Sequence, residues 1–328
     1  MKVNSFDLIK DPTEEELHSI DRELNFVRVS NQNPQVLSNS QIGKYNEQGY
    51  LMPFDGLSST EIAELRDFFD QILAEALAEG KNSYSISTAH LKFGKIYDLM
   101  HHPAIIAPVK ELLGEDLVAW GAHFFCKMPN DGKRVPWHQD CPYWPLTPTR
   151  TATVWLAIDN ATPENANMRF IPGSHLDGLI EYKMSNSPDD IIKREVQNVE
   201  EFGTPIDITL KAGQFSIHSD LLLHGSDANS SKMRRSGLTM RYAASQVKAY
   251  LLPTGITGFM VEFTNIPFTK KSTLAIVPAV LLTSTMMGMP ELASNLGMVP
   301  LPSKEGRDIT STLWFGLAGT NAVLRSWK

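Results

Sequence analysis

After Gly114 the sequence breaks into short apolar runs separated by Gly, Pro, Asn and Asp, and this pattern constrains the fold more than any other feature. Runs bounded in this way are typical of the strands of an all-β core. The predicted strands are 117–127, 135–140, 151–158, 168–171, 204–210, 214–218, 221–224 and 237–247. Gly173, Gly213 and Gly225 fall between predicted strands, where tight turns need residues that tolerate positive φ. We therefore expect a mainly β fold, a jelly roll or barrel with flanking helices.

The segment before the strands contains the helices. A short helix is expected from Ser40, followed by a brief strand over 49–54. Ser58 with Glu61 predicts the start of an amphipathic helix that ends near Ala78, because a cap residue and an acid in the first turn stabilise a helix N-terminus. A second helix is predicted from Pro103 to Leu113, before Gly114.

The domain organisation follows from composition along the chain. Residues 1–37 mix polar, charged and scattered apolar groups and are expected to form a peripheral or poorly ordered arm. Residues 38–250 are expected to form the main domain, and 251–328 an atypical C-terminal extension. The apolar stretch 273–289 within this extension has no charged residue and is short for a spanning helix. We leave open whether the extension is packed, is a membrane anchor or comes from an imperfect gene prediction.

Composition limits the partners. A net charge of -7 and a pI near 5.7 argue against nucleic acid or an anionic membrane surface, both of which select basic patches. Small molecules are the expected partners. Two cysteines, Cys126 and Cys141, are too few for a disulfide framework and indicate a reducing compartment. Since the N-terminus lacks the apolar run of a secretory signal, we expect the protein in the cytoplasm.

The stretch from Val135 to Trp144 holds the first candidate site. If it is extended, His138 and Asp140 point to the same face, so that an imidazole and a carboxylate converge. A divalent metal with open coordination positions is the commonest reason for such a pair. The best candidate for a third ligand is His224, which would complete the two-histidine, one-carboxylate triad of non-haem Fe(II) oxygenases.

The blocks around these residues resemble the phytanoyl-CoA dioxygenase family of Fe(II)/2-oxoglutarate oxygenases. The matching blocks are Trp-His-Gln-Asp at 137–140, Tyr-Trp-Pro-Leu at 143–146, Thr-Val-Trp-Leu-Ala-Ile-Asp at 153–159, Met-Arg-Phe-Ile-Pro-Gly-Ser-His at 168–175, His-Gly-Ser at 224–226 and Arg-Arg-Ser-Gly at 234–237. The resemblance implies a double-stranded β-helix (jelly-roll or cupin-like) core. It also implies that His138, Asp140 and His224 hold Fe(II), with 2-oxoglutarate and O2 as cosubstrates.

By the same resemblance, Arg235 stands where the family places the arginine that binds the far carboxylate of 2-oxoglutarate. A guanidinium suits that role because its planar fork pairs with a carboxylate and stays charged. The alternative for Arg235 is a solvated charge in a basic turn. The other residues that we assign to the cosubstrate pocket are Lys127, Thr153, Trp155 and Ser226, with packing as the alternative for Trp155.

Three further residues are candidates for the substrate pocket. His123 lies on the same face as Lys127 on the strand that leads toward the metal stretch, although packing explains it equally well. Trp144 follows the carboxylate ligand by four residues, where related oxygenases carry an aromatic that shields the iron, or it packs a loop. Arg241 shares a strand face with Arg235, and it faces an anionic substrate or forms a structural salt bridge.

These observations predict an Fe(II)- and 2-oxoglutarate-dependent dioxygenase that hydroxylates a small organic molecule and releases succinate and CO2. The alternative is a non-catalytic jelly-roll protein that binds a small molecule. The intact residues His138, Asp140, His224 and Arg235 argue against it. Neither the prime substrate nor the oligomeric state follows from the sequence.

Overall fold

The computed structural model describes residues 13–251, 259–262 and 274–275. The helices are α1 (Glu14–His18), α2 (Asn39–Gln48), α3 (Ser59–Ala78), α4 (Ala89–Lys92), α5 (Gly94–Met100) and α6 (Pro103–Leu113). Single 3-10 turns are η1 (Cys141–Tyr143), η2 (Pro163–Asn165), η3 (Ser174–Asp177) and η4 (Val199–Phe202). The strands to Phe170 are β1 (Tyr50–Asp55), β2 (Leu117–Lys127), β3 (Val135–His138), β4 (Leu146–Thr147), β5 (Thr151–Ala157) and β6 (Met168–Phe170). The later strands are β7 (Lys183–Met184), β8 (Arg194–Glu195), β9 (Ile206–Ile208), β10 (Gln214–Ser219), β11 (His224–Ser226), β12 (Arg235–Ala244), β13 (Lys248–Leu251), β14 (Phe259–Glu262) and β15 (Leu274–Ala275).

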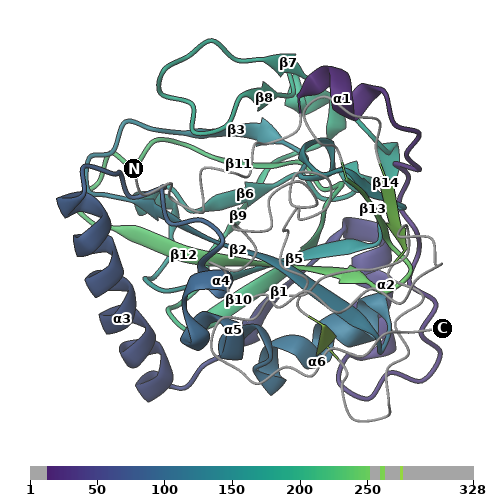
Figure 1. Cartoon of the computed structure of the whole chain (residues 1–328), viewed down its shortest axis with the longest axis horizontal. Helices are drawn as coiled ribbons and strands as arrows, with labels where there is room; N and C mark the ends of the chain where they lie inside the picture. The colour runs from purple at the N-terminus through teal and green to yellow at the C-terminus, as the bar shows by residue number, and fades with distance from the viewer. Residues whose placement is uncertain (1–12, 252–258, 263–273, 276–328) are drawn as a thin grey trace, which may run out of the picture. The chain divides into compact units, whose positions relative to one another are not determined.

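Two sheets build the core (Figure 1). The major sheet has the order β1-β10-β5-β12-β2-β15, and the minor sheet has the order β3-β11-β6-β9. Neighbouring strands are antiparallel, except that β15 runs parallel to β2. An apolar cluster that includes Trp155 of the major sheet and Phe170 of the minor sheet lies between them. The two sheets therefore face each other as a jelly roll, which confirms the predicted fold class.

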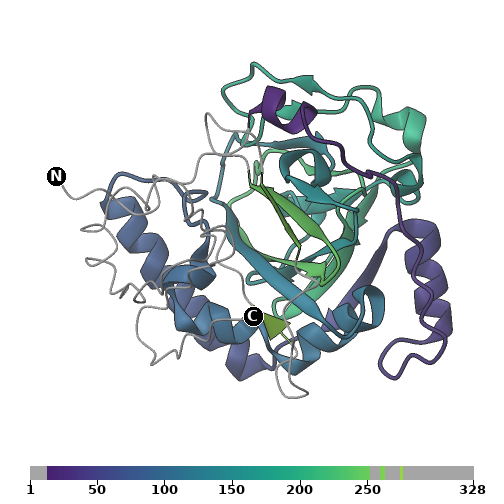
Figure 2. The ribbon, with the colours of Figure 1, turned by 45° about the vertical axis from the view of Figure 1, so that its right-hand side comes forward.

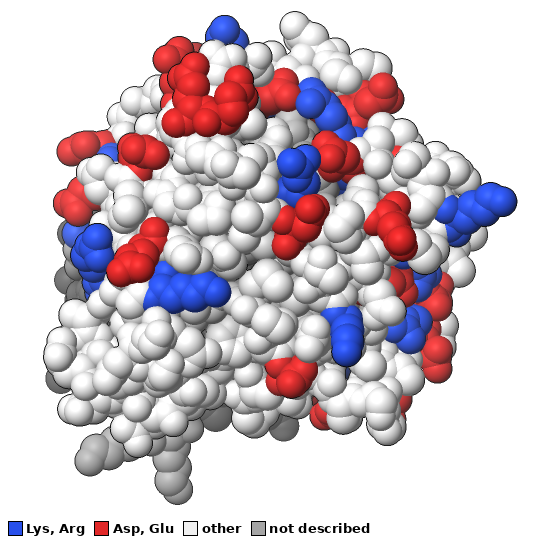
Figure 3. Space-filling view, turned by 180° about the vertical axis from the view of Figure 1, so that it is seen from behind, with Lys and Arg blue, Asp and Glu red and all other residues white. Residues whose placement is uncertain are grey.

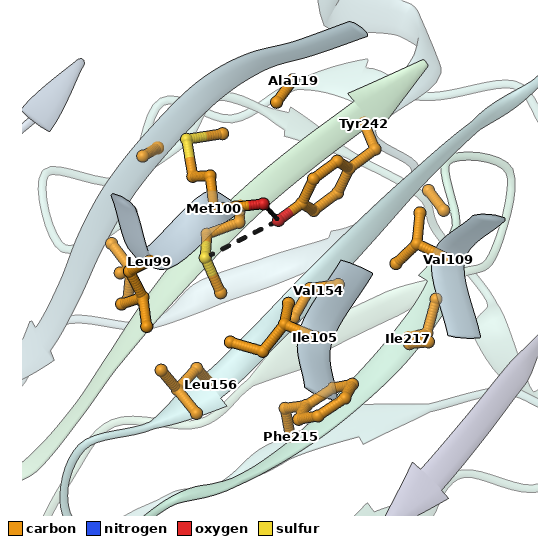
Figure 4. Packing of buried hydrophobic residues seen from close by; sticks show 14 of the residues in the cluster. Leu99, Met100, Ile105, Val109, Ala119, Val154, Leu156, Phe215, Ile217 and Tyr242 are labelled. Atoms are coloured by element: carbon orange, nitrogen blue, oxygen red, sulfur yellow. Dashed lines mark hydrogen bonds between the residues drawn. The ribbon is translucent and has the colours of Figure 1, made fainter. Parts of the chain in front are cut away.

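The other face of the major sheet packs on helices. Ile105 and Val109 of α6 contact a core that includes Leu156 and Ile217, and the Tyr242 hydroxyl donates to the carbonyl of Met100 (Figure 4). Figure 2 shows the helices between residues 59 and 113 outside the curled sheet. Alternate residues of β12 therefore face helices, and the remaining ones face the minor sheet.

The two long helices form where predicted. At α3, the Ser58 side chain accepts from the Glu61 amide while the Glu61 carboxylate accepts from the Ser58 amide, which is a capping box. α6 begins with Pro103 and is capped by Gly114. The sequence analysis missed α4 and α5, which are too short to show a clear apolar period.

Two predicted strands next to the candidate metal site have wrong bounds. The strand predicted over 135–140 ends at His138, and Asp140 has helical dihedral angles (φ -76°, ψ -37°) at the start of η1. The strand predicted over 221–224 begins only at His224. Leu221, Leu222 and Leu223 are fully buried in a turn instead, and a short apolar run does not distinguish a buried turn from a buried strand.

Two of the three glycines that were predicted to lie in tight turns do have positive φ. Gly173 and Gly213 have φ of +89° and +88°. Gly225 lies inside β11, and a Cβ there would come within 3.0 Å of the Val135 carbonyl oxygen. A close approach between β11 and β3 explains this glycine, not a tight turn.

The described part of the N-terminal arm runs along the main domain. Leu17 is buried, and Arg22 donates to the carbonyls of Cys141 and Trp144 in the loop that follows Asp140. At the other end, β13 pairs with both β4 and β14. The proposed boundaries at 37 and 250 stay predictions, and the apolar stretch 273–289 lies outside the described residues except for 274–275.

The described surface carries mixed charges. On the face shown in Figure 3, single Lys and Arg side chains are scattered among Asp and Glu. Within the described ranges, none of the helices combines the length and the apolar character that a membrane span requires.

Candidate metal centre and cosubstrate pocket

His138 and His224 are brought together by strand register. The two residues are direct partners on the antiparallel strands β3 and β11, and their ring centroids lie 4.1 Å apart. The Nδ1 of His138 lies 2.8 Å from the Pro136 carbonyl oxygen, and the Nδ1 of His224 lies 2.9 Å from that of Leu222. Because a carbonyl oxygen only accepts, both Nδ1 atoms carry a proton. In the neutral ring Nε2 is then the nitrogen with a lone pair for a metal.

Asp140 completes the cluster from the turn after β3. Its amide donates to the Asp220 carbonyl, which fixes the turn, and one carboxylate oxygen lies 3.9 Å from the His138 Nε2. One ligand atom from each of the three residues lies within 4.8 Å of the others, and all three side chains are buried. Two imidazole nitrogens and one carboxylate oxygen on one side of a pocket fit Fe(II) with open coordination positions.

The protonation states agree with metal binding. Burial, helped by the neighbouring His224, lowers the pKa of His138 to about 3. Burial acts to raise the pKa of Asp140, but His224 and Arg241 outweigh it and hold the pKa at about 2. A neutral ring and an ionised carboxylate are the forms that bind a metal.

Thr153 orients the carboxylate from the major sheet. Its hydroxyl donates to the Asp140 Oδ2 at 3.0 Å, which leaves Oδ1 as the oxygen on the His138 side. Hydrogen bonds of this kind fix the ligand geometry and tune the affinity for the metal.

We expect Thr153→Val to lower the affinity for Fe(II) by about ten- to a hundred-fold, because the shape is kept and the donor is lost. Titration with Co(II), followed by its absorption bands, measures this. Thr153→Ser keeps the hydroxyl and should bind the metal almost as well as the unmodified protein. Equal affinity in the valine variant would show that Thr153 does not position Asp140.

Arg235 lies at one end of the same pocket. It is 2% exposed, and its guanidinium donates to the Ala166 carbonyl and to the Ser226 hydroxyl at 3.0 Å. Burial lowers its pKa to about 10, so the group is still charged at neutral pH. Among the described residues no carboxylate forms a salt bridge with it. A buried cation with neutral partners is costly to keep, and the far carboxylate of 2-oxoglutarate would compensate it.

Trp155 forms a wall beside this arginine. The Arg235 guanidinium lies 5.6 Å from the indole. The ring occupies space that exists only because residue 237 is glycine, since a Cβ there would lie 2.2 Å from a ring atom of Trp155.

Eight of the predicted site residues line one pocket that is partly open to solvent. These are His138, Asp140, Thr153, Trp155, His224, Ser226, Arg235 and Arg241. Lys127, His123 and Trp144 are not among the lining residues.

Lys127 supports the pocket from behind. It is fully buried, and its Nζ donates to the carbonyls of Ser226 and Asp227. Burial and the charge of Arg235 lower the pKa of Lys127 to about 6. The side chain thus holds the end of β11. His123 packs on Phe125, with ring centroids 4.5 Å apart.

His218, which was not predicted as a site residue, also lines the pocket. Its Nε2 lies 3.9 Å from the Asp140 Oδ2, and its ring centroid lies 4.8 Å from that of His224. It stands opposite Thr153 in the strand register. That register is the signal that could have found it, but the pairing of two residues that are 65 positions apart cannot be predicted from one sequence.

Comparison with known proteins gives a consistent result. The family model described as Phytanoyl-CoA dioxygenase (PhyH) matches residues 45–237. A probable phytanoyl-CoA dioxygenase of Caenorhabditis elegans is 24% identical over 264 residues, which cover 72% of this chain and 85% of that protein. A probable alpha-ketoglutarate-dependent hypophosphite dioxygenase of Stutzerimonas stutzeri is 26% identical over 62% of this chain and 77% of that protein. Among solved structures, the non-heme monooxygenase ThoJ superposes with a TM-score of 0.55 and 25% identity, covering 78% of this chain and 94% of its own.

Proposed function

The chain belongs to the phytanoyl-CoA dioxygenase family, and on that premise we propose that the pocket is the active site of an Fe(II)- and 2-oxoglutarate-dependent dioxygenase. It hydroxylates a small organic substrate and releases succinate and CO2. The observation that carries this proposal is the joint presence, in one pocket, of the triad and a buried arginine that forms no salt bridge with a described carboxylate.

Each side of the pocket has a separate task. His138, Asp140 and His224 would hold Fe(II) from one side and leave its other positions facing the pocket. When bound, the iron with 2-oxoglutarate and O2 supplies the oxidising power for hydroxylation of a C–H bond. The burial of all three ligands limits the access of water to the metal.

Arg235 and Ser226 would bind the far carboxylate of 2-oxoglutarate. The guanidinium is charged and fixed by two neutral acceptors, so little ordering is needed when the anion arrives. Trp155 restricts this end of the pocket, and Lys127 holds the carbonyls at the end of β11. These contacts support a cosubstrate site at the Arg235 end.

The alternative, a binding protein without catalysis, finds no support in the relatives. The two curated relatives described above are named as dioxygenases. A protein that only binds a ligand needs neither a carboxylate beside two histidines nor the hydroxyl of Thr153 that orients it.

Arg235→Leu tests the cosubstrate assignment. Because a hydrogen-bonded charge contributes about 1.5–3 kcal/mol, we expect the affinity for 2-oxoglutarate to fall by roughly ten- to a hundred-fold while iron binding persists. Calorimetric titration of the Zn(II)-loaded protein with 2-oxoglutarate measures this without turnover.

Arg234→Leu is the matched control. Arg234 immediately precedes β12 but pairs with Asp159 and Asp70 outside the pocket. We expect its affinity for 2-oxoglutarate to stay unchanged. If the Arg235 variant also bound 2-oxoglutarate normally, the cosubstrate site would lie elsewhere.

The partners and the compartment that we propose follow from the sequence. A small-molecule substrate fits the pocket, and nucleic acid is not expected for a chain of net charge -7. Cys126 and Cys141 are both free and buried, which supports a reducing compartment, and we propose the cytoplasm.

A further inference from the structure

A second arginine lines the pocket away from Arg235. Arg235 and Arg241 lie on the same face of β12, and both line the pocket. Six residues separate them, which is about 20 Å of strand at the usual rise. Arg235 stands beside Lys127 in the register, whereas Arg241 stands beside Thr153. The two guanidiniums therefore belong to opposite ends of the pocket.

Arg241 belongs to a polar row across the major sheet. In the strand register, His218 pairs with Thr153, and Thr153 pairs with Arg241. Paired residues project to the same face, and all three line the pocket. Thr153 is committed to Asp140. His218 is 1% exposed, and within the described part of the chain neither of its ring nitrogens has a hydrogen-bond partner. Buried polar atoms of this kind usually indicate a missing partner.

The charged residues that line the pocket favour the binding of an anion. Among the described lining residues Asp140 is the only acid, against Arg235 and Arg241. With Fe(II) and the two carboxylates of 2-oxoglutarate in place, one positive charge remains.

Two tryptophans restrain the second arginine. The Arg241 guanidinium lies 5.8 Å from the Trp120 ring and 5.2 Å from the Trp144 ring, and the two rings meet edge to face at 4.7 Å. Such cation–π contacts restrain the position of the guanidinium. Trp144 would thus act on the pocket through Arg241.

We propose that Arg241, with His218 beside it, binds an anionic group of the prime substrate, such as a carboxylate, phosphonate or sulfonate. This inference rests on the proposed function, because it assigns the Arg235 end of the pocket to 2-oxoglutarate. The anion then anchors the substrate beside Asp140, at the end of the pocket opposite to the cosubstrate carboxylate.

The test is a binding experiment on the full chain loaded with Zn(II) and 2-oxoglutarate, so that no turnover is needed. Calorimetry compares matched probes: hexanoate with hexanamide, hexylphosphonate with its diethyl ester, and hexanesulfonate with hexanesulfonamide. We expect at least one anionic probe to bind and its neutral partner to bind at least ten-fold more weakly. The anion that binds best identifies the group.

Arg241→Gln should lower the affinity for that anionic probe by roughly ten- to a hundred-fold and leave the affinity for 2-oxoglutarate unchanged. Arg241→Lys should keep the preference for the anion in weaker form. Arg169→Gln is the matched control, because Arg169 pairs with Asp227 and does not line the pocket; it should bind the probe normally.

Four results would overturn the inference: no anionic probe binds, the neutral partner binds equally well, Arg241→Gln binds the anion normally, or Arg241→Gln loses 2-oxoglutarate as Arg235→Leu does. Failure of the proposed function has a different signature. In that case the unmodified Zn(II)-loaded protein would not bind 2-oxoglutarate at all, and the inference would fall with it.

Discussion

His138→Ala and His224→Ala should each abolish Fe(II) binding and turnover. Each replacement leaves one imidazole and one carboxylate, and two donors hold a labile ferrous ion poorly. The loss should exceed the ten- to hundred-fold effect that is typical of residues that only support a ligand. Metal content after anaerobic loading and desalting measures the binding, and succinate formation from 2-oxoglutarate measures the turnover.

His102→Ala is the control for this pair. His102 precedes α6 and contacts Glu61 on α3, on the helical side of the major sheet. Its replacement should leave iron binding unchanged. Full iron occupancy in either ligand variant would show that the triad is wrong. Circular dichroism should show that both ligand variants remain folded, because neither side chain belongs to the apolar core.

The grouping of the three candidate metal ligands was predictable, but the reason given for one of them was incomplete. His138 lies in a strand as expected. Asp140 does not share that strand; it reaches the same point because its amide and that of Cys141 both donate to the Asp220 carbonyl and turn the chain. Asp220 is 80 residues away in sequence, and a long-range hydrogen bond of this kind leaves no local signal.

The register between strands is the part of the site that could not be predicted from the sequence. Alternation along β12 correctly placed Arg235 and Arg241 on the pocket face. It could not show that Thr153 lies between Arg241 and His218. Register depends on contacts between strands that are distant in sequence, so His218 was found only with the structure. Lys127 shares the face, but its position at the end of β2 turns its amine toward backbone carbonyls.

Helix prediction succeeded where local chemistry is decisive. The capping box at Ser58 and the Pro103 start of α6 are read directly from neighbouring residues. α4 and α5 contain four and seven residues, and helices this short depend on packing more than on their own sequence.

Gly237→Ala should destabilise the protein and weaken 2-oxoglutarate binding, although it adds a single methyl group. The new Cβ would lie 2.2 Å from one atom of the Trp155 ring and 2.5 Å from another, far inside the usual contact distance of about 3.5–4.0 Å. Overpacking of this kind costs about 1–3 kcal/mol. β12 is paired on both sides, with β2 and β5, so its backbone cannot easily move. The indole must therefore shift, and it packs against the Arg235 guanidinium.

Thermal unfolding and calorimetric titration with 2-oxoglutarate check both effects. Gly121→Ala is the matched control, because Gly121 also lies in the major sheet and a Cβ there would meet Arg241 atoms no closer than 3.5 Å; its stability and 2-oxoglutarate affinity should be normal. Combining Gly237→Ala with Trp155→Phe removes part of the overlapping ring. The double variant should be more stable than Gly237→Ala alone, because the two changes relieve the same contact. If the phenylalanine gave no recovery, the glycine would be needed for a reason other than the indole.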